Sequence, residues 1–260
     1  MAKIFIGTSG YSYKDWIGPV YPEGTKQADF LKIYAEQFDV VELNFSYYRQ
    51  PEAGLMEKLL RMTGDDFKFS IKAYKGLTHE ITHDPSLETS RFKEGIAPLI
   101  EASQLGAVLL QFPYSFHYTR ESRKYLQNLC AQLQGVPLSI EFRNNEWLKD
   151  SVYKTLREYN IAIVSVDEPD LPKLLKPSDR TTATFSYIRF HGRNKKMWWH
   201  GDNTTRYDYL YTEQELEAWI PRIQCMAART TTLFIFFNNH RNGQAVINAR
   251  QLQELLKIAT

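Results

Sequence analysis

The stretch AVLLQF, residues 107–112, is an almost continuous run of apolar side chains with one polar residue near its end. Such runs are typical of strands that are buried on both faces, as in a parallel sheet covered by helices. Similar short runs recur along the chain, and we interpret each as a β-strand. The predicted strands are Ile4–Thr8, Val40–Asn44, Lys68–Lys72, Ala107–Phe112, Leu138–Phe142, Ala162–Asp167, Ser186–His191 and Thr232–Asn238.

The segments between these runs carry apolar residues at the spacing of a helix. Helices are predicted through Phe30, Leu31, Tyr34 and Phe38, over Leu55–Met62, Phe92–Ala102, Tyr125–Leu133, Val152–Tyr159 and Leu216–Met226, and through Leu252, Leu255, Leu256 and Ala259. The sixth connection, Pro169–Pro177, is bounded by proline, so only a turn or two of helix is expected there. The alternation predicts one α/β domain over residues 1–260, a (β/α)8 TIM-like barrel. The alternative is an open doubly wound sheet.

Composition limits the function classes. The 260 residues carry 32 basic and 30 acidic side chains, a net charge of +2, which is too balanced for coating nucleic acid through bulk charge. Cys130 and Cys225 lie far apart in apolar patterns, which favours two buried free thiols over a disulfide. The N-terminal segment lacks the apolar stretch of a signal peptide, and no run has membrane-spanning length. We therefore expect a cytoplasmic protein with no membrane partner.

Polar residues gather where the predicted strands end. Glu42 and Asn44 are two residues apart, as are Glu141 and Arg143, and this spacing places side chains on one face of a strand. Arg189, His191 and Arg193 repeat the pattern on the seventh strand. If that face is the barrel interior, these charges converge at its mouth, where barrel enzymes build their sites. The candidate proton carriers are Glu42, Glu141, His191 and Asp167.

Several cationic groups point to an anionic ligand. Arg189, Arg193 and Arg241 follow the seventh and eighth strands, the usual phosphate corner of barrel enzymes. The turn of residues 239–243 leads into the final helix, whose N-terminal amides suit an anion. In the alternative interpretation, the arginines only neutralise the nearby carboxylates. The candidate binding residues are Tyr11, Trp16, Asn44, Lys72, Arg143, Arg189, Arg193, Trp198, Asn238, Asn239 and His240.

Other chemistries have less support. The histidines match no HExxH pattern and no Cys/His cluster, so we predict no metal site. No dinucleotide or nucleotide-loop fingerprint is present, and no cofactor is predicted. Aromatic and basic residues are interleaved after the seventh strand, which suits base stacking, a lid over a small ligand, or packing of the loop on the barrel rim.

The motifs together resemble the YecE-like family (domain of unknown function 72) from about Ile4 to Leu255. They are GTSGYSYKDWIGPVYPEG (7–24), VELNFSYYRQP (41–51), LLQFPYSF (109–116), SIEFRNNEW (139–147), RFHG (189–192) and FFNNHRNGQAVINARQL (236–252). The resemblance implies a divergent (β/α)8 barrel of the general kind seen in sugar-isomerase-like and endonuclease-IV-like barrels, and it implies no reaction. The chain departs from the family pattern at Phe45, Tyr114 and Asn144. At Asn144 the family often has histidine, so one proton carrier is absent here.

We therefore expect a metal-independent acid/base enzyme, a hydrolase, lyase or isomerase, acting on a phosphate-bearing or otherwise anionic substrate. One alternative is a non-catalytic binder of nucleic acid or nucleotides. The other is a metal-dependent, endonuclease-like hydrolase. All three depend on Glu42, Glu141, Arg143, Arg189 and His191 sharing one pocket.

Overall fold

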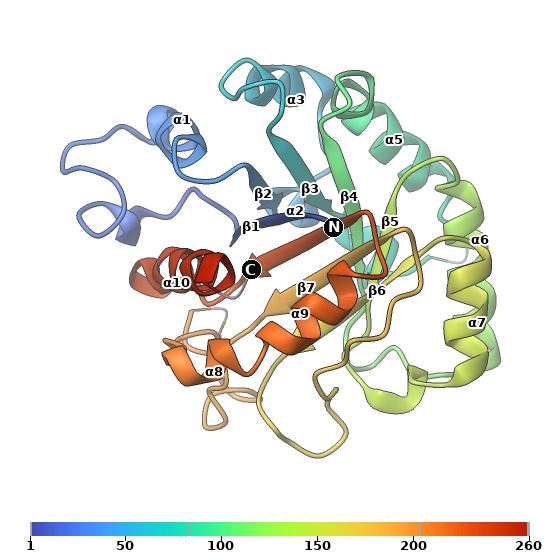
Figure 1. Ribbon diagram of the computed structural model, residues 1–260. Helices are drawn as coiled ribbons and strands as arrows, with labels where there is room; N and C mark the ends of the chain where they lie inside the picture. The colour runs from blue at the N-terminus through green and yellow to red at the C-terminus, as the bar shows by residue number, and fades with distance from the viewer. Residues whose placement is uncertain (1, 83, 203, 259–260) are drawn as a thin grey trace.

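Parallel strands close into a barrel, as the apolar runs predict (Figure 1). The structure is a computed structural model that describes residues 2–82, 84–202 and 204–258. Within these residues eight strands pair in sequence order, and β1 pairs with β8 to complete the barrel. The strands are β1 (Lys3–Ser9), β2 (Val40–Leu43), β3 (Lys68–Lys72), β4 (Leu105–Gln111), β5 (Leu138–Glu141), β6 (Ala162–Asp167), β7 (Phe185–Phe190) and β8 (Thr232–Phe237). The open doubly wound alternative is wrong.

Helices surround the barrel and cover its outer face (Figure 1). They are α1 (Phe30–Ala35), α2 (Phe45–Tyr48), α3 (Ala53–Leu60), α4 (Lys75–Thr78), α5 (Ser86–Glu101), α6 (Arg120–Gln132), α7 (Asp150–Glu158), α8 (Glu213–Glu217), α9 (Ile220–Ala227) and α10 (Gln244–Ile258). Short 3-10 turns lie at Lys14–Trp16, Gln27–Asp29, Asn145–Trp147 and Arg241–Gly243. In the described part of the chain, no helix has the length and apolar character needed to cross a membrane.

The barrel interior changes character along its axis. Phe5, Val40, Ala107, Val164 and Phe234 belong to one buried apolar cluster in the interior. Neighbouring strand residues, such as Ile6, Val41 and Val108, belong to a separate cluster with the surrounding helices. Toward the carboxyl ends of the strands, the inward positions become polar. The alternation of the pleat therefore brings polar side chains from different strands to one end of the barrel.

Two connections differ from the sequence prediction. Residues 169–177 form turns without a helix, and Lys173 adopts a left-handed φ of 68° that a helix does not accept. The predicted helix Leu216–Met226 is two helices, because Pro221 begins a new one at the start of α9. A capping box formed by Thr212 and Glu215 starts α8.

Both cysteines are free, as predicted, but they are half-buried rather than buried. Burial raises the pKa of the Cys130 thiol to about 12. A thiol held in its protonated form at neutral pH is a poor nucleophile.

Candidate functional site

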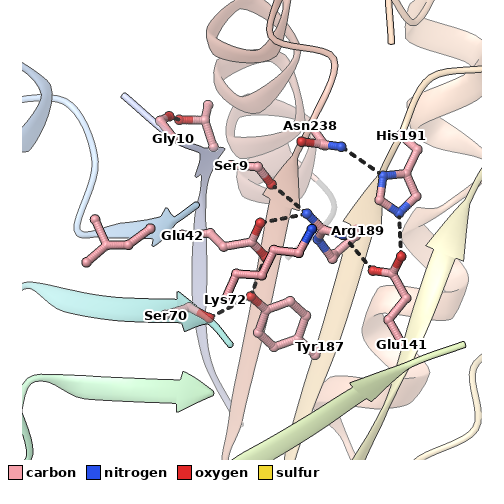
Figure 2. Close-up of polar contacts among 12 residues, drawn as sticks. Ser9, Gly10, Glu42, Ser70, Lys72, Glu141, Tyr187, Arg189, His191 and Asn238 are labelled. Carbon is pink, nitrogen blue, oxygen red and sulfur yellow. Dashed lines mark hydrogen bonds and ion pairs between the residues drawn. The ribbon is translucent and has the colours of Figure 1, made fainter. Parts of the chain in front are cut away.

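Arg189 lies at the centre of a buried charge network inside the barrel mouth (Figure 2). Its Nη2 donates to Glu42 Oε1 and its Nη1 donates to Glu141 Oε2, both at 2.7 Å. Both carboxylates are completely buried, and the arginine side chain is 2% exposed. One guanidinium therefore joins β2 and β5 across the barrel and neutralises part of their charge.

Two hydroxyl groups, from Tyr187 and Ser70, support this network from deeper inside the barrel. Tyr187 donates its hydroxyl proton to Glu42 Oε2 at 2.6 Å, and its oxygen lies 2.6 Å from the hydroxyl of Ser70. Sequence reasoning missed both residues, although each lies two positions before a predicted site residue, Arg189 or Lys72. The same alternation that selected the charged residues points to them.

Glu141 also contacts Arg143 and His191 on its other oxygen. Arg143 Nε lies 2.6 Å from Glu141 Oε1, and His191 Nε2 lies 3.2 Å from the same atom. Burial opposes ionisation of this carboxyl, but Arg143, Arg189 and His191 outweigh it and hold the pKa of Glu141 well below its usual range. Glu141 is therefore an ionised acceptor whose two oxygens are both occupied.

His191 is held neutral in one tautomer. Burial, followed by the charge of Arg143, lowers the pKa of His191 to about 3. Because Glu141 can only accept, Nε2 carries the proton, and Nδ1 accepts from the Asn238 amide at 3.2 Å. The imidazole is completely buried with both nitrogens engaged. This environment suits a fixed hydrogen-bonding group and not a proton carrier at neutral pH.

Lys72 differs from the other charged groups because its amine is not paired. In Figure 2 its side chain reaches from β3 toward Arg189. Among the hydrogen bonds and ion pairs of the described residues, none involves Lys72 Nζ, which lies 4.3 Å from the centre of the Tyr47 ring. Burial, together with the charge of Arg189, lowers the pKa of Lys72 to about 7. A substantial fraction of this amine is therefore unprotonated at neutral pH.

A two-lobed cavity opens at the barrel mouth. One lobe, of about 430 Å³, is lined by Tyr11, Tyr13, Asn44, Asn238 and His240, among others. The other lobe, of about 380 Å³, is lined by His79, Gln111, Tyr114, Trp198, Trp199 and Arg206, among others. The lobes share a wall made of Tyr47, Tyr48, Lys72, Arg143 and Tyr207.

Two further ionisable groups near this wall were not among the predicted site residues. Glu168 follows β6 on the interior side, with Oε2 3.7 Å from Arg143 Nη1, and burial raises its pKa to about 7. His79 lies beside the Tyr47 ring, and burial together with the charge of Lys72 lowers its pKa to about 4. Sequence reasoning had no signal that placed either residue beside the cavity.

The prediction that Asp167 shares this pocket is wrong. Val164 and Val166 face the barrel interior, so Asp167 faces outward. There it accepts hydrogen bonds from Tyr211 at 2.8 Å and from Trp219 Nε1 at 2.7 Å. Asp167 therefore anchors the segment after β7 and the start of α9.

Arg193 is also displaced from the predicted face. Gly192, with φ of +83°, turns the chain after β7 and interrupts the two-residue alternation. Arg193 consequently donates to Asp167 Oδ2 at 2.6 Å and to Glu215 at 2.9 Å. Its charge is occupied outside the cavity.

Two other predicted binding residues, Trp16 and Asn239, and Arg241 of the predicted phosphate corner have structural contacts. Trp16 is completely buried, and its Nε1 donates to the carbonyl of His240 at 2.6 Å. Asn239 faces outward and donates to Tyr209 and Asn248. Arg241 pairs with Asp208, and the amide of Asn242 donates to Asp15 at 2.7 Å. The predicted phosphate corner is therefore occupied by the protein's own carboxylates.

The two tryptophans in the aromatic and basic segment after β7 differ in exposure. Trp198 is 4% exposed, and its ring lies 5.9 Å from the Arg143 guanidinium, whereas Trp199 is 49% exposed. Tyr11, Asn44, Asn238, His240 and Trp198 line the cavity as the sequence predicts.

Among the described residues, no three His, Cys, Asp or Glu side chains are grouped as metal ligands would be.

Comparison with known proteins identifies relatives of the whole chain. The family model described as "Protein of unknown function DUF72" matches residues 5–260. The UPF0759 protein YunF of Bacillus subtilis (strain 168) is 34% identical over 274 aligned residues, which cover 98% of this chain and 95% of that protein.

Solved structures agree with the sequence relatives. A DUF72 family protein from Thermotoga maritima MSB8 superposes with a TM-score of 0.91 at 40% identity, covering 98% of this chain and 99% of that one. A DUF72 family protein from Enterococcus faecalis V583 gives a TM-score of 0.87 at 28% identity, covering 98% and 95%. The similarity thus extends over nearly the full length of each protein.

Proposed function

The chain belongs to the DUF72 family of proteins of unknown function, and for this member we propose an enzyme that acts on a small anionic substrate in the two-lobed cavity. Lys72 supplies the reacting amine, and Arg143 binds the anionic group. The observation that carries this proposal is the amine of Lys72, which lies in the wall shared by the two lobes and has no hydrogen bond or ion pair to any other described residue.

The charges of the network support this assignment. Glu42 and Glu141 are matched by Arg189 and Arg143, so these four side chains carry no net charge. When protonated, Lys72 adds one positive charge at the shared wall. Glu168 lies 3.7 Å from Arg143, and burial raises its pKa to about 7. When Glu168 and Lys72 are both protonated, an anion entering the cavity meets a net positive wall.

This proposal reassigns the roles predicted for the residues. Glu42, Glu141 and His191 position and charge the cavity, because all three are completely buried and hydrogen-bonded to other side chains. Lys72, predicted as an anion ligand, becomes the group that takes up a proton or attacks the substrate. An amine with a lowered pKa is suited to either task.

Trace acetylation of each lysine between pH 5 and pH 11, read by peptide mass spectrometry, tests this proposal. Half-maximal labelling of Lys72 is expected near pH 7, where burial and Arg189 place its pKa. An ordinary lysine titrates near about 10.4. Titration of Lys72 at that ordinary value would remove the reacting amine from the proposal.

Inorganic phosphate should slow the acetylation of Lys72 in the wild type, because an anion beside Arg143 covers the amine and raises its pKa. The variant Arg143→Gln should lose this protection. Arg157→Gln, on the exposed side of α7, serves as the matched control and should keep it. Equal protection in both variants would show that Arg143 does not bind the anion.

A further inference from the structure

We propose that Lys72 forms a covalent imine with a small 2-oxo acid whose carboxylate is bound by Arg143. This inference rests on the proposed function, since it specifies the substrate class for the same cavity. Its geometric basis is that the amine and the guanidinium share one wall, with space on both sides.

The position of the amine suits attack on a carbonyl carbon. A nucleophilic amine needs a lone pair that is not used in an ion pair. The carboxylates beside Lys72 are held by Arg189 and Arg143, and its own close contact is the face of the Tyr47 ring. The ring face and the two nearby carboxylates favour the charged amine, whereas burial and the two arginines oppose it and prevail.

The anionic group belongs next to the carbonyl for electrostatic reasons. Arg143 is one of the charges that act on Lys72, and both side chains line each lobe. A substrate that meets both groups at once must carry its negative charge close to its electrophilic carbon. In a 2-oxo acid the carboxylate and the carbonyl carbon are directly bonded, which matches this arrangement.

The chemical step balances without an oxidant or a metal. The lone pair of Nζ forms a bond to the carbonyl carbon, while the carbonyl π electrons move to oxygen. One proton passes from nitrogen to that oxygen and gives a carbinolamine. Loss of the hydroxyl group with the second amine proton releases one water and leaves the C=N bond. Tyr207, which also lines both lobes, is available to relay protons in this dehydration.

Borohydride trapping tests the imine directly. Wild-type protein is incubated at pH 7.5 with pyruvate or with 2-oxoglutarate, reduced with sodium cyanoborohydride, digested and mapped by mass spectrometry. A secondary-amine adduct is expected on Lys72 at a level at least about tenfold above that on an ordinary exposed lysine, because far more of its amine is unprotonated. Lys154 on α7 is exposed and provides the internal reference.

Two variants and a neutral carbonyl compound make the test specific. Lys72→Arg should show no adduct at this position, whereas Lys154→Arg should keep the full adduct on Lys72. Arg143→Gln should lose much more labelling by pyruvate than by propanal, which has no carboxylate, because the loss of the Arg143 charge raises the pKa of Lys72 equally for both compounds. Equal loss with both compounds would contradict the role of Arg143 in binding the carboxylate.

The outcomes separate this inference from the proposed function. If Lys72 is acetylated near pH 7 with protection by phosphate, but neither oxo acid is fixed by borohydride, the imine is refuted and the proposed function stands. If Lys72 is acetylated only at the pH of ordinary lysines, both are refuted. An adduct on Lys72 no stronger than that on Lys154 also refutes the imine.

Discussion

Replacing Arg189 with methionine tests the charge network at its centre. The substitution keeps much of the side-chain volume but removes two 2.7 Å ion pairs, leaving two fully buried carboxylates without this partner. Breaking a buried pair by removing one member destabilises a protein by about 3–5 kcal/mol. For a chain of this length, each kcal/mol lowers the melting temperature by about 2 °C, so a fall of about 6–10 °C is expected.

Thermal and urea unfolding at pH 7.5 measure this effect, with Tyr187→Phe as the matched control. That variant removes the hydrogen bonds of the Tyr187 hydroxyl to Glu42 and Ser70 and leaves every charge in place. It should lower the unfolding free energy by only about 1–2 kcal/mol. If Arg189→Met is no less stable than Tyr187→Phe, the energy of the ion pairs only compensates for the cost of burying the charges. That result would refute the reasoning.

The pH dependence of the same variant provides a second check. The pKa of Glu141 in the folded protein is held well below its usual range, in part by Arg189. A lowered carboxyl pKa contributes stability above about pH 4.3, and this contribution is lost as the pH falls through the folded value. The difference in unfolding free energy between the wild type and Arg189→Met should therefore be largest at neutral pH and should decrease below about pH 4. A gap that does not change with pH would contradict an electrostatic origin.

Two shorter predictions concern Lys72 and Asp167. The folded pKa of Lys72 is about 7, so the stability of the wild type relative to Lys72→Met should rise with pH above that value. This difference in unfolding free energy, measured by urea unfolding, should increase by up to about 1.4 kcal/mol per pH unit until about pH 10.4. A difference that does not change with pH would contradict a lowered pKa of Lys72. Asp167→Asn should weaken the contacts to Arg193 and Tyr211 and destabilise the protein by about 1–3 kcal/mol. It should speed amide exchange in residues 206–212, while the acetylation profile of Lys72 is unchanged; a shifted profile would place Asp167 in the site after all.

The barrel was predictable because its strands are buried on both faces. Runs such as residues 107–112 and 232–237 are apolar at nearly every position, and helical periodicity separates the runs. The segment of residues 169–177 was harder to predict, because its conformation depends on distant groups. Leu175 donates its amide proton to Glu168, and Ser178 donates to Ser165. Local propensity carries no information about such contacts.

The same two-residue alternation explains where site prediction succeeded and where it failed. It placed Glu42, Glu141 and Arg189 together because each lies near the end of a regular strand. It failed at Arg193, where the positive φ of Gly192 ends the alternation. It gave no guidance at Asp167, because a strand that is apolar on both faces does not reveal which face a terminal polar residue joins.

The depth of each inward-facing residue in the barrel explains why Glu42 and Glu141 are buried while the amine of Lys72 faces the cavity. Residues 70 and 72 point into the barrel from the same strand, and Ser70 lies within the hydrogen-bonded layer below Arg189. Lys72 lies two residues further along β3, nearer the barrel mouth than Ser70. The carboxylates of Glu42 and Glu141 are already bonded to Arg189. Burial lowers the pKa of the Lys72 amine, and the charge of Arg189 lowers it further, whereas Glu141 and Glu42 raise it. The network therefore forms the rigid floor of the cavity, and burial above that floor is the main cause that favours the neutral, reactive form of Lys72.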